Sequence, residues 1–190
     1  MVRRAFLVLG FFWLAPGLAQ GALKGENLLV PPMPAGWKKS YEGSGNGIDM
    51  VAYVPANESA DAWTQQITIA VYGGHNNAKP RDLQQIVTNG LGQNCEALHV
   101  EDRGAGTISG LPAGRWVTYC SRLKQLNLGE ITFHQAVGGH SHLFLVQRTW
   151  RGNAFDISRP PIDQATIGQW EQYFNQVAVC DSADPGRPCP

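Results

Sequence analysis

Two histidines two positions apart, His140 and His142, follow the dipeptide Gly138-Gly139 and are the clearest candidate metal ligands in the sequence. Residues two apart on a β-strand point to the same face, so both imidazoles could reach one metal ion. Gln135 is expected to oppose His142 across a hairpin, but no carboxylate or third histidine has a defined place beside the pair. The pair therefore predicts either a metal-binding hairpin tip or a solvated tip that holds no metal.

A second group that could bind something combines Arg148 and Arg151 with Trp150. Arg148 and Trp150 share one face of the strand predicted over 140–150. Guanidinium groups beside aromatic rings are common anchors of protein–protein interfaces. The alternative is a strand end whose arginines extend along apolar surface to reach water. We treat the group as a candidate partner-binding surface.

The common local motifs of catalysis are absent or incomplete. The tripeptide from His99 to Glu101 matches the first half of a zinc deaminase signature, but the Pro-Cys-x-x-Cys half is missing. The glycines between Gly104 and Gly110 do not have the spacing of a dinucleotide-binding loop. Neither Gly-x-Ser-x-Gly nor His-Glu-x-x-His occurs. We therefore expect a protein without catalytic residues or a cofactor, although a site built from distant residues leaves no local motif.

The N-terminal residues have the order of a secretory signal peptide. Arg3 and Arg4 precede an apolar run over 5–14, and the small residues Gly17 and Ala19 stand where a signal peptidase would cut. The apolar run is too short to span a bilayer well, and no second run follows. The chain has 15 Lys and Arg against 15 Asp and Glu, which argues against nucleic acid as a partner. We expect a periplasmic or secreted protein with no stable membrane span after cleavage.

Four cysteines follow this predicted signal, namely Cys95, Cys120, Cys180 and Cys189. An even number of cysteines in an exported chain predicts disulfides, although four cysteines allow three pairings. Sequence position favours Cys95 with Cys120 and Cys180 with Cys189. No Cys-x-x-Cys is present, so a thioredoxin-like redox site is not expected.

The periodicity of apolar residues places these groups on a mixture of strands and helices. Strands are predicted over 48–54, 64–72, 97–102, 115–123, 128–137 and 140–150, and helices over 80–93 and 162–178. The stretch 104–114 is predicted as a loop with a short strand at most. Gly138-Gly139 suits the positive φ of a two-residue hairpin turn. Because the strands on either side of it carry apolar residues on both faces, the sheet should be covered on both sides.

The expected fold is therefore α+β, an antiparallel sheet with helices on both faces, or an α/β/α sandwich, with two disulfides. The expected organisation is a signal peptide over 1–19, an extended lead-in segment over 20–47, a single domain over 48–180, and a disulfide-closed tail over 181–190.

Several short motifs together resemble a family of small, largely uncharacterised exported bacterial proteins. The motifs are Pro34-Ala-Gly36-Trp37, Tyr53-Val-Pro55, Trp63-Thr64 running into Ile67-Thr68, and the tail Val179-Cys180-Asp181 with Cys189-Pro190. The resemblance covers most of the chain after the predicted signal, and the layout is similar to the PsbP-like fold. It implies a non-catalytic binding or assembly role and supplies no catalytic residues.

The sequence thus predicts a non-catalytic periplasmic protein that binds another envelope or secreted protein in an accessory or protective role. Two alternatives stay open. One is a module that binds a small ligand or a metal ion, and the other is a hydrolase whose site is assembled from distant residues.

Overall fold

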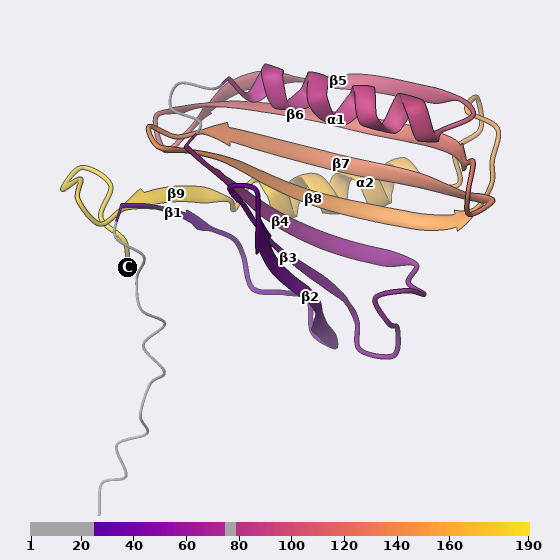
Figure 1. Ribbon diagram of the computed structural model, residues 1–190, viewed down its shortest axis with the longest axis horizontal. Helices are drawn as coiled ribbons and strands as arrows, with labels where there is room; N and C mark the ends of the chain where they lie inside the picture. Colours follow the sequence, from indigo (N-terminus) through magenta and orange to yellow (C-terminus); the bar gives the residue numbers. More distant parts are fainter. Residues whose placement is uncertain (1–24, 75–78) are drawn as a thin grey trace, which may run out of the picture.

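The computed structural model describes residues 25–74 and 79–190 (Figure 1). The predicted signal peptide, residues 1–19, lies outside the described residues. In the described part the elements follow the order β1 (Glu26–Leu29), β2 (Trp37–Gly45), β3 (Ile48–Pro55), β4 (Gln65–Gly73), α1 (Pro80–Asn94), β5 (Leu98–Ile108), β6 (Leu111–Leu123), β7 (Leu128–Gly138), β8 (His142–Asn153), α2 (Gln164–Phe174) and β9 (Ala178–Asp181).

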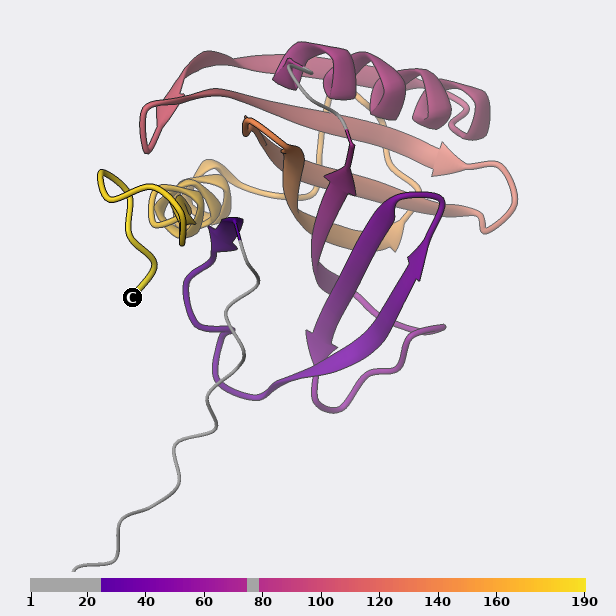
Figure 2. The same ribbon diagram turned by 60° about the vertical axis from the view of Figure 1, so that its left-hand side comes forward.

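Seven of these strands form one antiparallel sheet in the order β2-β3-β4-β8-β7-β6-β5, and β1 pairs with β9 in a separate antiparallel ribbon. The main sheet twists strongly, as sheets of L-residues do. As a result the β2–β3 hairpin is turned well away from the plane of β5, β6 and β7 (Figure 2).

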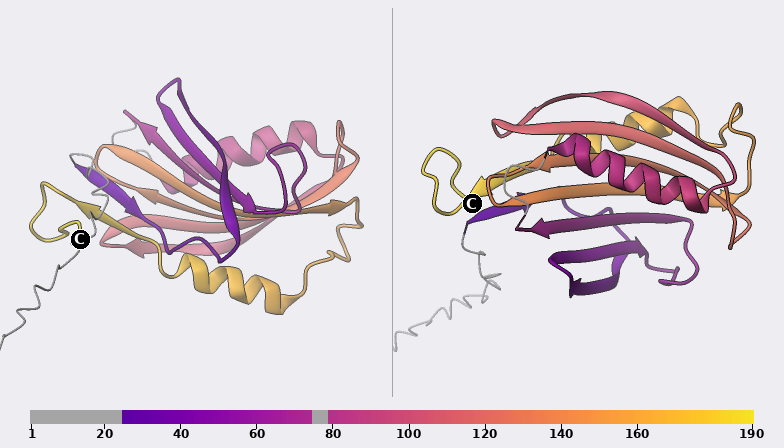
Figure 3. Two further views of the ribbon diagram at one scale, coloured as in Figure 1. Left: turned by 90° about the horizontal axis from the view of Figure 1, so that it is seen from below. Right: turned by 45° about the horizontal axis from the view of Figure 1, so that its top comes forward.

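The two helices pack on opposite faces of the sheet. On one face Leu83 of α1 lies in a buried cluster with Trp116, and on the other Trp170 of α2 lies in a cluster with Val117. Trp116 and Val117 are neighbours in β6, so their side chains point to opposite faces. The helices cover only part of the sheet, and the β2–β3 hairpin projects beyond both (Figures 2 and 3). The fold is therefore α+β, but the full sandwich that we expected is formed only in part.

Each helix begins where its capping residues predict. In α1, Pro80 occupies the first turn and the Asp82 carboxylate accepts the Lys79 N–H at 3.0 Å. In α2, the Asp163 carboxylate accepts the Thr166 N–H at 2.8 Å. The helix ends at Phe174 rather than at 178, because Ala178–Asp181 pairs with β1. Within the described ranges, neither helix is both long and apolar enough to cross a membrane.

Two tight hairpin turns lie in stretches that the sequence predicted as an extended lead-in segment and as a loop. Asn46 and Gly47 join β2 to β3, and Ser109 and Gly110 join β5 to β6, and all four residues have positive φ. Turns of this type match the twist of the paired strands. The stretch 104–114 is therefore not a loop but the end of a long hairpin. Likewise, residues 20–47 contain β1 and β2, so β2 extends the main sheet instead of leading into it.

The β7–β8 hairpin forms with a different turn from the one predicted. Gly138 pairs with Leu143, and neither Gly138 nor Gly139 has positive φ. Gln135 consequently lies opposite Val146, four residues beyond the predicted partner His142. A shift by an even number of residues keeps every side chain on its predicted face. For this reason the predicted division of the hairpin into two apolar faces holds although the register does not.

Two disulfides fasten the ends of elements. Cys95 follows the last residue of α1 and is bonded to Cys120 of β6, while Cys180 of β9 is bonded to Cys189 in the C-terminal tail. These are the pairings that sequence position favours. Disulfides persist in oxidising compartments, so they are compatible with an extracellular or envelope protein.

Candidate functional site

The candidate site is a hollow of about 580 Å³ between α1 and the β5–β6 hairpin, which we call the α1 groove. Its volume lies within the range of roughly 300–1,000 Å³ that is typical of small-ligand pockets. One wall is the side of α1 that carries Arg81, Gln84 and Thr88, and the floor is formed by β5 and β6.

The groove exists because both ends of α1 are fixed over β6 rather than over β5. At the C-terminal end the Cys95–Cys120 disulfide joins the helix to β6. At the N-terminal end Pro80 packs over Gly114, where a Cβ atom would lie 3.4 Å from the Pro80 Cβ. The edge strand β5 is therefore left without a helix above it (Figure 3).

Small and apolar residues make the floor of the groove. Ala105 pairs with Gly114, so its side chain points to the same face as α1. Val100 lies farther along β5 and is 36% exposed, and Pro112 contributes from β6. Gly104, with a φ of 96°, accommodates the bulge between Asp102 and Ala105. The floor can thus receive an apolar group without moving a large side chain.

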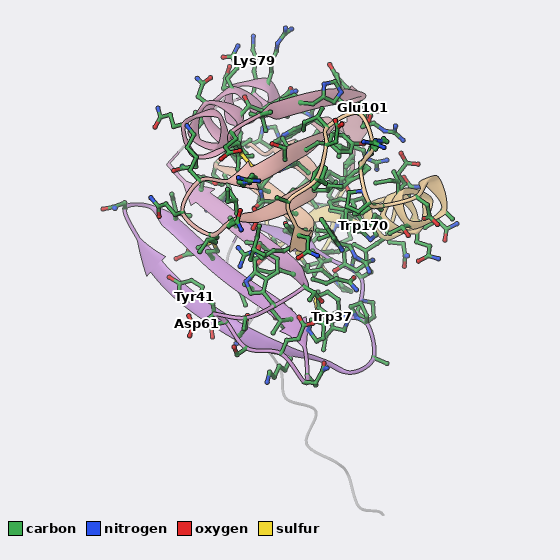
Figure 4. The ribbon with its side chains drawn as sticks, turned by 90° about the vertical axis from the view of Figure 1, so that its right-hand side faces the viewer. Trp37, Tyr41, Asp61, Lys79, Glu101 and Trp170 are labelled. Atoms are coloured by element: carbon green, nitrogen blue, oxygen red, sulfur yellow. A yellow bond between two sulfur atoms is a disulfide. The ribbon has the colours of Figure 1, made fainter. Side chains whose placement is uncertain are left out.

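Two cations stand at the end of the groove where α1 begins. Lys79 and Arg81 are exposed, and neither forms an ion pair with any residue of the described chain. Lys79 lies at the outer side of the molecule in Figure 4. The acidic residue of the lining, Asp102, directs its carboxylate at its own strand and accepts the Gly104 N–H at 2.8 Å. The rim at the start of the helix therefore carries two positive charges and one negative charge, the Asp82 carboxylate that accepts the Lys79 N–H.

A second hollow, of about 270 Å³, lies beside the same hairpin and is lined partly by Arg103. The Arg103 guanidinium is already bonded to two carboxylates, those of Glu101 and Glu171. Because its charge is neutralised within the fold, we do not regard this hollow as a binding site.

The predicted histidine tip holds a carboxylate of the chain itself. The backbone N–H groups of His140 and Ser141 donate to the two carboxylate oxygens of Glu26, at 2.8 and 2.9 Å. Glu26 is 5% exposed, and burial alone would raise its pKa. The hydrogen bonds from His140 and Ser141 outweigh burial and lower the pKa of Glu26. The tip thus anchors β1 to the β7–β8 hairpin.

Metal binding at this tip stays a prediction. His142 Nδ1 lies 2.8 Å from Ser141 Oγ and 4.0 Å from a Glu26 oxygen, while His140 is exposed. Over residues 25–74 and 79–190 no three His, Cys, Asp or Glu side chains gather in a group that could hold a metal ion.

Arg148 of the predicted partner surface is half-buried under α2. Its guanidinium carbon lies 5.9 Å from the ring centroid of Trp37 and 5.5 Å from that of Trp170, two residues on one flank of the molecule (Figure 4). Its Nε is buried and has no hydrogen-bond partner in the described chain. Burial lowers the pKa of Arg148.

The other two residues of that surface lie on opposite faces of the sheet. Trp150 shares the face of Arg148 and packs edge-on against Phe155. Arg151 points to the α1 face, where its guanidinium lies 3.6 Å from the Trp63 ring centroid and forms an ion pair with Glu130 at 2.6 Å. The three residues therefore do not form one continuous surface.

Sequence reasoning missed a fully buried histidine, His134. Gln147 Nε2 donates to its Nδ1 at 3.0 Å, and its Nε2 lies 2.8 Å from Thr118 Oγ1. The ring stacks on Trp116 with centroids 4.7 Å apart. Burial lowers the pKa of His134 to about 3, so the ring is neutral at pH 7. With both nitrogens engaged, His134 has no free nitrogen for acid–base chemistry or metal binding.

Comparisons with known proteins add little to this description. No family model matches the chain, and no curated protein matches it. Among solved structures, one similar chain is LpqN, described as involved in cell envelope biogenesis of Mycobacterium tuberculosis. The two chains are 13% identical with a TM-score of 0.46, over 84% of this chain and 87% of LpqN. At that level of likeness we base no conclusion about function on it.

Proposed function

We propose that this protein is a non-catalytic binding protein of the bacterial periplasm, and that the α1 groove receives a small ligand with an apolar body. The observation that carries the proposal is the groove itself. It is open to solvent, it has a floor of small apolar side chains, and the Cys95–Cys120 disulfide fixes one end of its helical wall. A rigid, largely apolar pocket with a few polar groups is the usual form of a ligand site.

The lining of the groove favours binding over catalysis. It contains no histidine, serine or cysteine, and the Asp102 carboxylate is engaged with the backbone of Gly104. The hydroxyl of Thr88 donates to the Gln84 carbonyl at 2.8 Å, so it is not poised as a nucleophile. Periplasmic location is supported by the predicted signal peptide and the two disulfides.

The resemblance to exported proteins of PsbP-like fold belongs to the same proposal. An antiparallel sheet with one helix on each face supports that assignment. The role that the resemblance implies, binding without catalysis, agrees with the chemistry of the groove.

The test uses a variant that fills the groove. Ala105→Phe would place a ring over the floor, and Ala97→Phe is the matched control because Ala97 is also exposed but does not line the groove. The tagged mature protein is purified from its native envelope and analysed by native mass spectrometry. We expect a bound small molecule on the wild type and on Ala97→Phe, and its loss from Ala105→Phe. Equal loading of all three proteins, or no bound molecule on any, would count against the proposal.

A protein partner is the second candidate, and two exposed apolar side chains favour it. Ile86 of α1 is 66% exposed and Val100 of the edge strand β5 is 36% exposed. Contiguous exposed apolar surface marks protein interfaces, and here Ile86 lies on α1 outside the groove while Val100 also lines the groove. The partner-binding surface that the sequence predicted around Arg148 supports this candidate less, because Arg148 lies half-buried under α2.

This candidate predicts that an Ile86→Ser/Val100→Ser variant loses an envelope protein that the wild type captures and that binds again when purified. Arg159→Gln, a change at a side chain 84% exposed and outside the groove, is the control. Retention of the partner by the double variant would argue that these side chains are not the interface.

A further inference from the structure

We infer that the occupant of the α1 groove is a single-chain amphiphile with an anionic head, of the chemical class of a free fatty acid. This inference rests on the proposed function and names the ligand of the same site. The positive charges of Lys79 and Arg81 would hold the anionic head at the end of the groove where α1 begins. The tail would lie on the apolar floor that leads away from that end.

The charged residues at the rim of the groove indicate the charge of the ligand's head group. Lys79 and Arg81 stand on either side of Pro80, and neither is paired with an acidic group of the described chain. An anion within contact distance of two unpaired cations gains attraction from both, and little desolvation is needed because the cations are exposed. Two carboxylates oppose this charge, and both are engaged with the backbone. Asp102 lies on the floor and accepts the Gly104 N–H at 2.8 Å, and Asp82 of the first turn accepts the Lys79 N–H at 3.0 Å. An anionic head is therefore favoured at the rim over a neutral or cationic one.

The direction and length of the groove floor indicate the shape and length of the tail that it can hold. Ala105 pairs with Gly114 beneath Pro80, and Val100 lies farther along β5, opposite Thr118. The wall runs from Arg81 to Thr88, which is about 10 Å at a rise of ~1.5 Å per residue. Thr88 donates its hydroxyl to the helix backbone. The far end of the groove is consequently suited to an unbranched hydrocarbon chain of medium length.

The experiment compares three ligands that share one chain and differ only in the head, namely decanoate, decanol and decylamine. Binding to the purified mature protein is measured by isothermal titration calorimetry and by ligand-observed NMR at low ionic strength and again at high ionic strength. Because the chain is constant, any difference in affinity reports on the head.

We expect decanoate to bind the wild type most tightly and decylamine least. Lys79→Gln/Arg81→Gln should weaken decanoate about tenfold or more at low salt, since each contact charge contributes roughly fivefold even in water. The same pair of changes should leave decanol unaffected, and added salt should reduce the effect. Asp102→Asn should act in the opposite direction and tighten decanoate, because it removes the opposing charge while retaining an acceptor for Gly104.

Two controls separate charge from fold and groove from surface. Lys38→Gln/Arg159→Gln removes two exposed cations that do not line the groove, and it should not change decanoate binding. Ala105→Phe should weaken all three ligands, whereas Ala97→Phe should weaken none.

The possible failures are distinguishable. If all three ligands bind with equal affinity and Ala105→Phe abolishes each, the inference about the anionic head is overturned while the proposed function stands. If decylamine binds best, the inference is likewise overturned. If none binds the wild type, both the anionic amphiphile and a groove for apolar ligands are refuted.

Discussion

Acidification should destabilise this protein through one buried side chain, His134. In the folded state its pKa is about 3, and burial is the cause. In the unfolded chain a histidine has a pKa of about 6.5. Between these two values the unfolded state binds a proton that the folded state does not, so the free energy of unfolding falls as the pH falls. The contribution is fully present above about pH 6.5 and is lost progressively toward pH 3.

The size of the effect follows from the two pKa values. Each pH unit within this window changes the free energy of unfolding by about 1.4 kcal/mol. Lowering the pH from 7.5 to 5 should therefore cost about 2 kcal/mol through His134 alone. That loss is a large fraction of the roughly 5–15 kcal/mol by which folded domains are stable.

The assay is urea unfolding at pH 7.5 and pH 5, followed by tryptophan fluorescence, for the wild type and for His134→Gln. His134→Gln will be less stable at both values because it loses the stacking on Trp116 and a hydrogen bond, so the comparison is the change with pH and not the absolute stability. We expect the variant to lose about 2 kcal/mol less than the wild type on acidification. His140→Gln, at an exposed histidine, is the control and should retain the pH dependence of the wild type.

NMR gives a direct check on the same reasoning. The imidazole of His134 in the folded wild type should stay neutral at pH 5. A protonated ring at that pH, or an unchanged pH dependence in His134→Gln, would refute the claim that burial of this side chain governs acid stability.

Two further perturbations test the parts that frame the sheet. Glu26→Gln removes a buried carboxylate whose pKa is lowered by hydrogen bonds from His140 and Ser141. The change should destabilise β1 by about 2 kcal/mol at pH 7, and this should be measured as faster amide hydrogen exchange in β1. The difference from the wild type should shrink as the pH falls below about 4, because this contribution is present above the unfolded pKa and lost below it; a difference constant with pH would contradict the assignment. Cys95→Ala/Cys120→Ala removes a disulfide with a sequence separation of 25 and should lower the free energy of unfolding by about 3 kcal/mol, measured by thermal unfolding. Ligand binding in the α1 groove should also weaken. Unchanged binding would show that the disulfide does not hold the helical wall in place.

Local sequence patterns were sufficient to predict much of the secondary structure. Alternation of apolar residues predicted a strand over 64–72, which forms as β4 (Gln65–Gly73), and helical spacing predicted a helix over 80–93, which forms as α1 (Pro80–Asn94). The cap of α2 is equally local, since the Asp163 carboxylate accepts the N–H of Thr166, three residues further on. These features depend on neighbours in the chain, which is why the sequence alone can show them.

The end of the β5–β6 hairpin, residues 104–114, was missed because glycines conceal the strand pattern, whereas the strands predicted over 97–102 and 115–123 lie in β5 and β6. Gly104, Gly106 and Gly114 have no side chain to show which face is apolar, so the region was predicted as a loop. The one local indication was the dipeptide Ser109-Gly110, whose residues both take positive φ in the turn. Asn46-Gly47 was a stronger indication of the same kind, and it marks the β2–β3 hairpin.

The candidate site itself could not be predicted from local patterns. The α1 groove arises because the helix lies over β6 and leaves β5 uncovered, and no short stretch of sequence encodes that placement. The burial of the predicted partner-binding residues could not be predicted from the sequence either. Arg148 and Trp150 lie on one face, as the alternation predicted, but only the position of α2 reveals that this face is enclosed.

The pairing of β1 with β9 makes the two ends of the described fold depend on each other. The Gly25 N–H donates to Ser182 Oγ across a separation of 157 residues, and Glu26 pairs with Asp181. Contacts this distant in sequence carry a large loop-closure entropy and slow the folding of the domain. A polypeptide that stops before Ala178 would leave the backbone of β1 without its partner strand, as an unprotected edge. Among the described strands, β9 is synthesised last and completes the hydrogen bonding of β1, so termination before Ala178 leaves β1 unpaired.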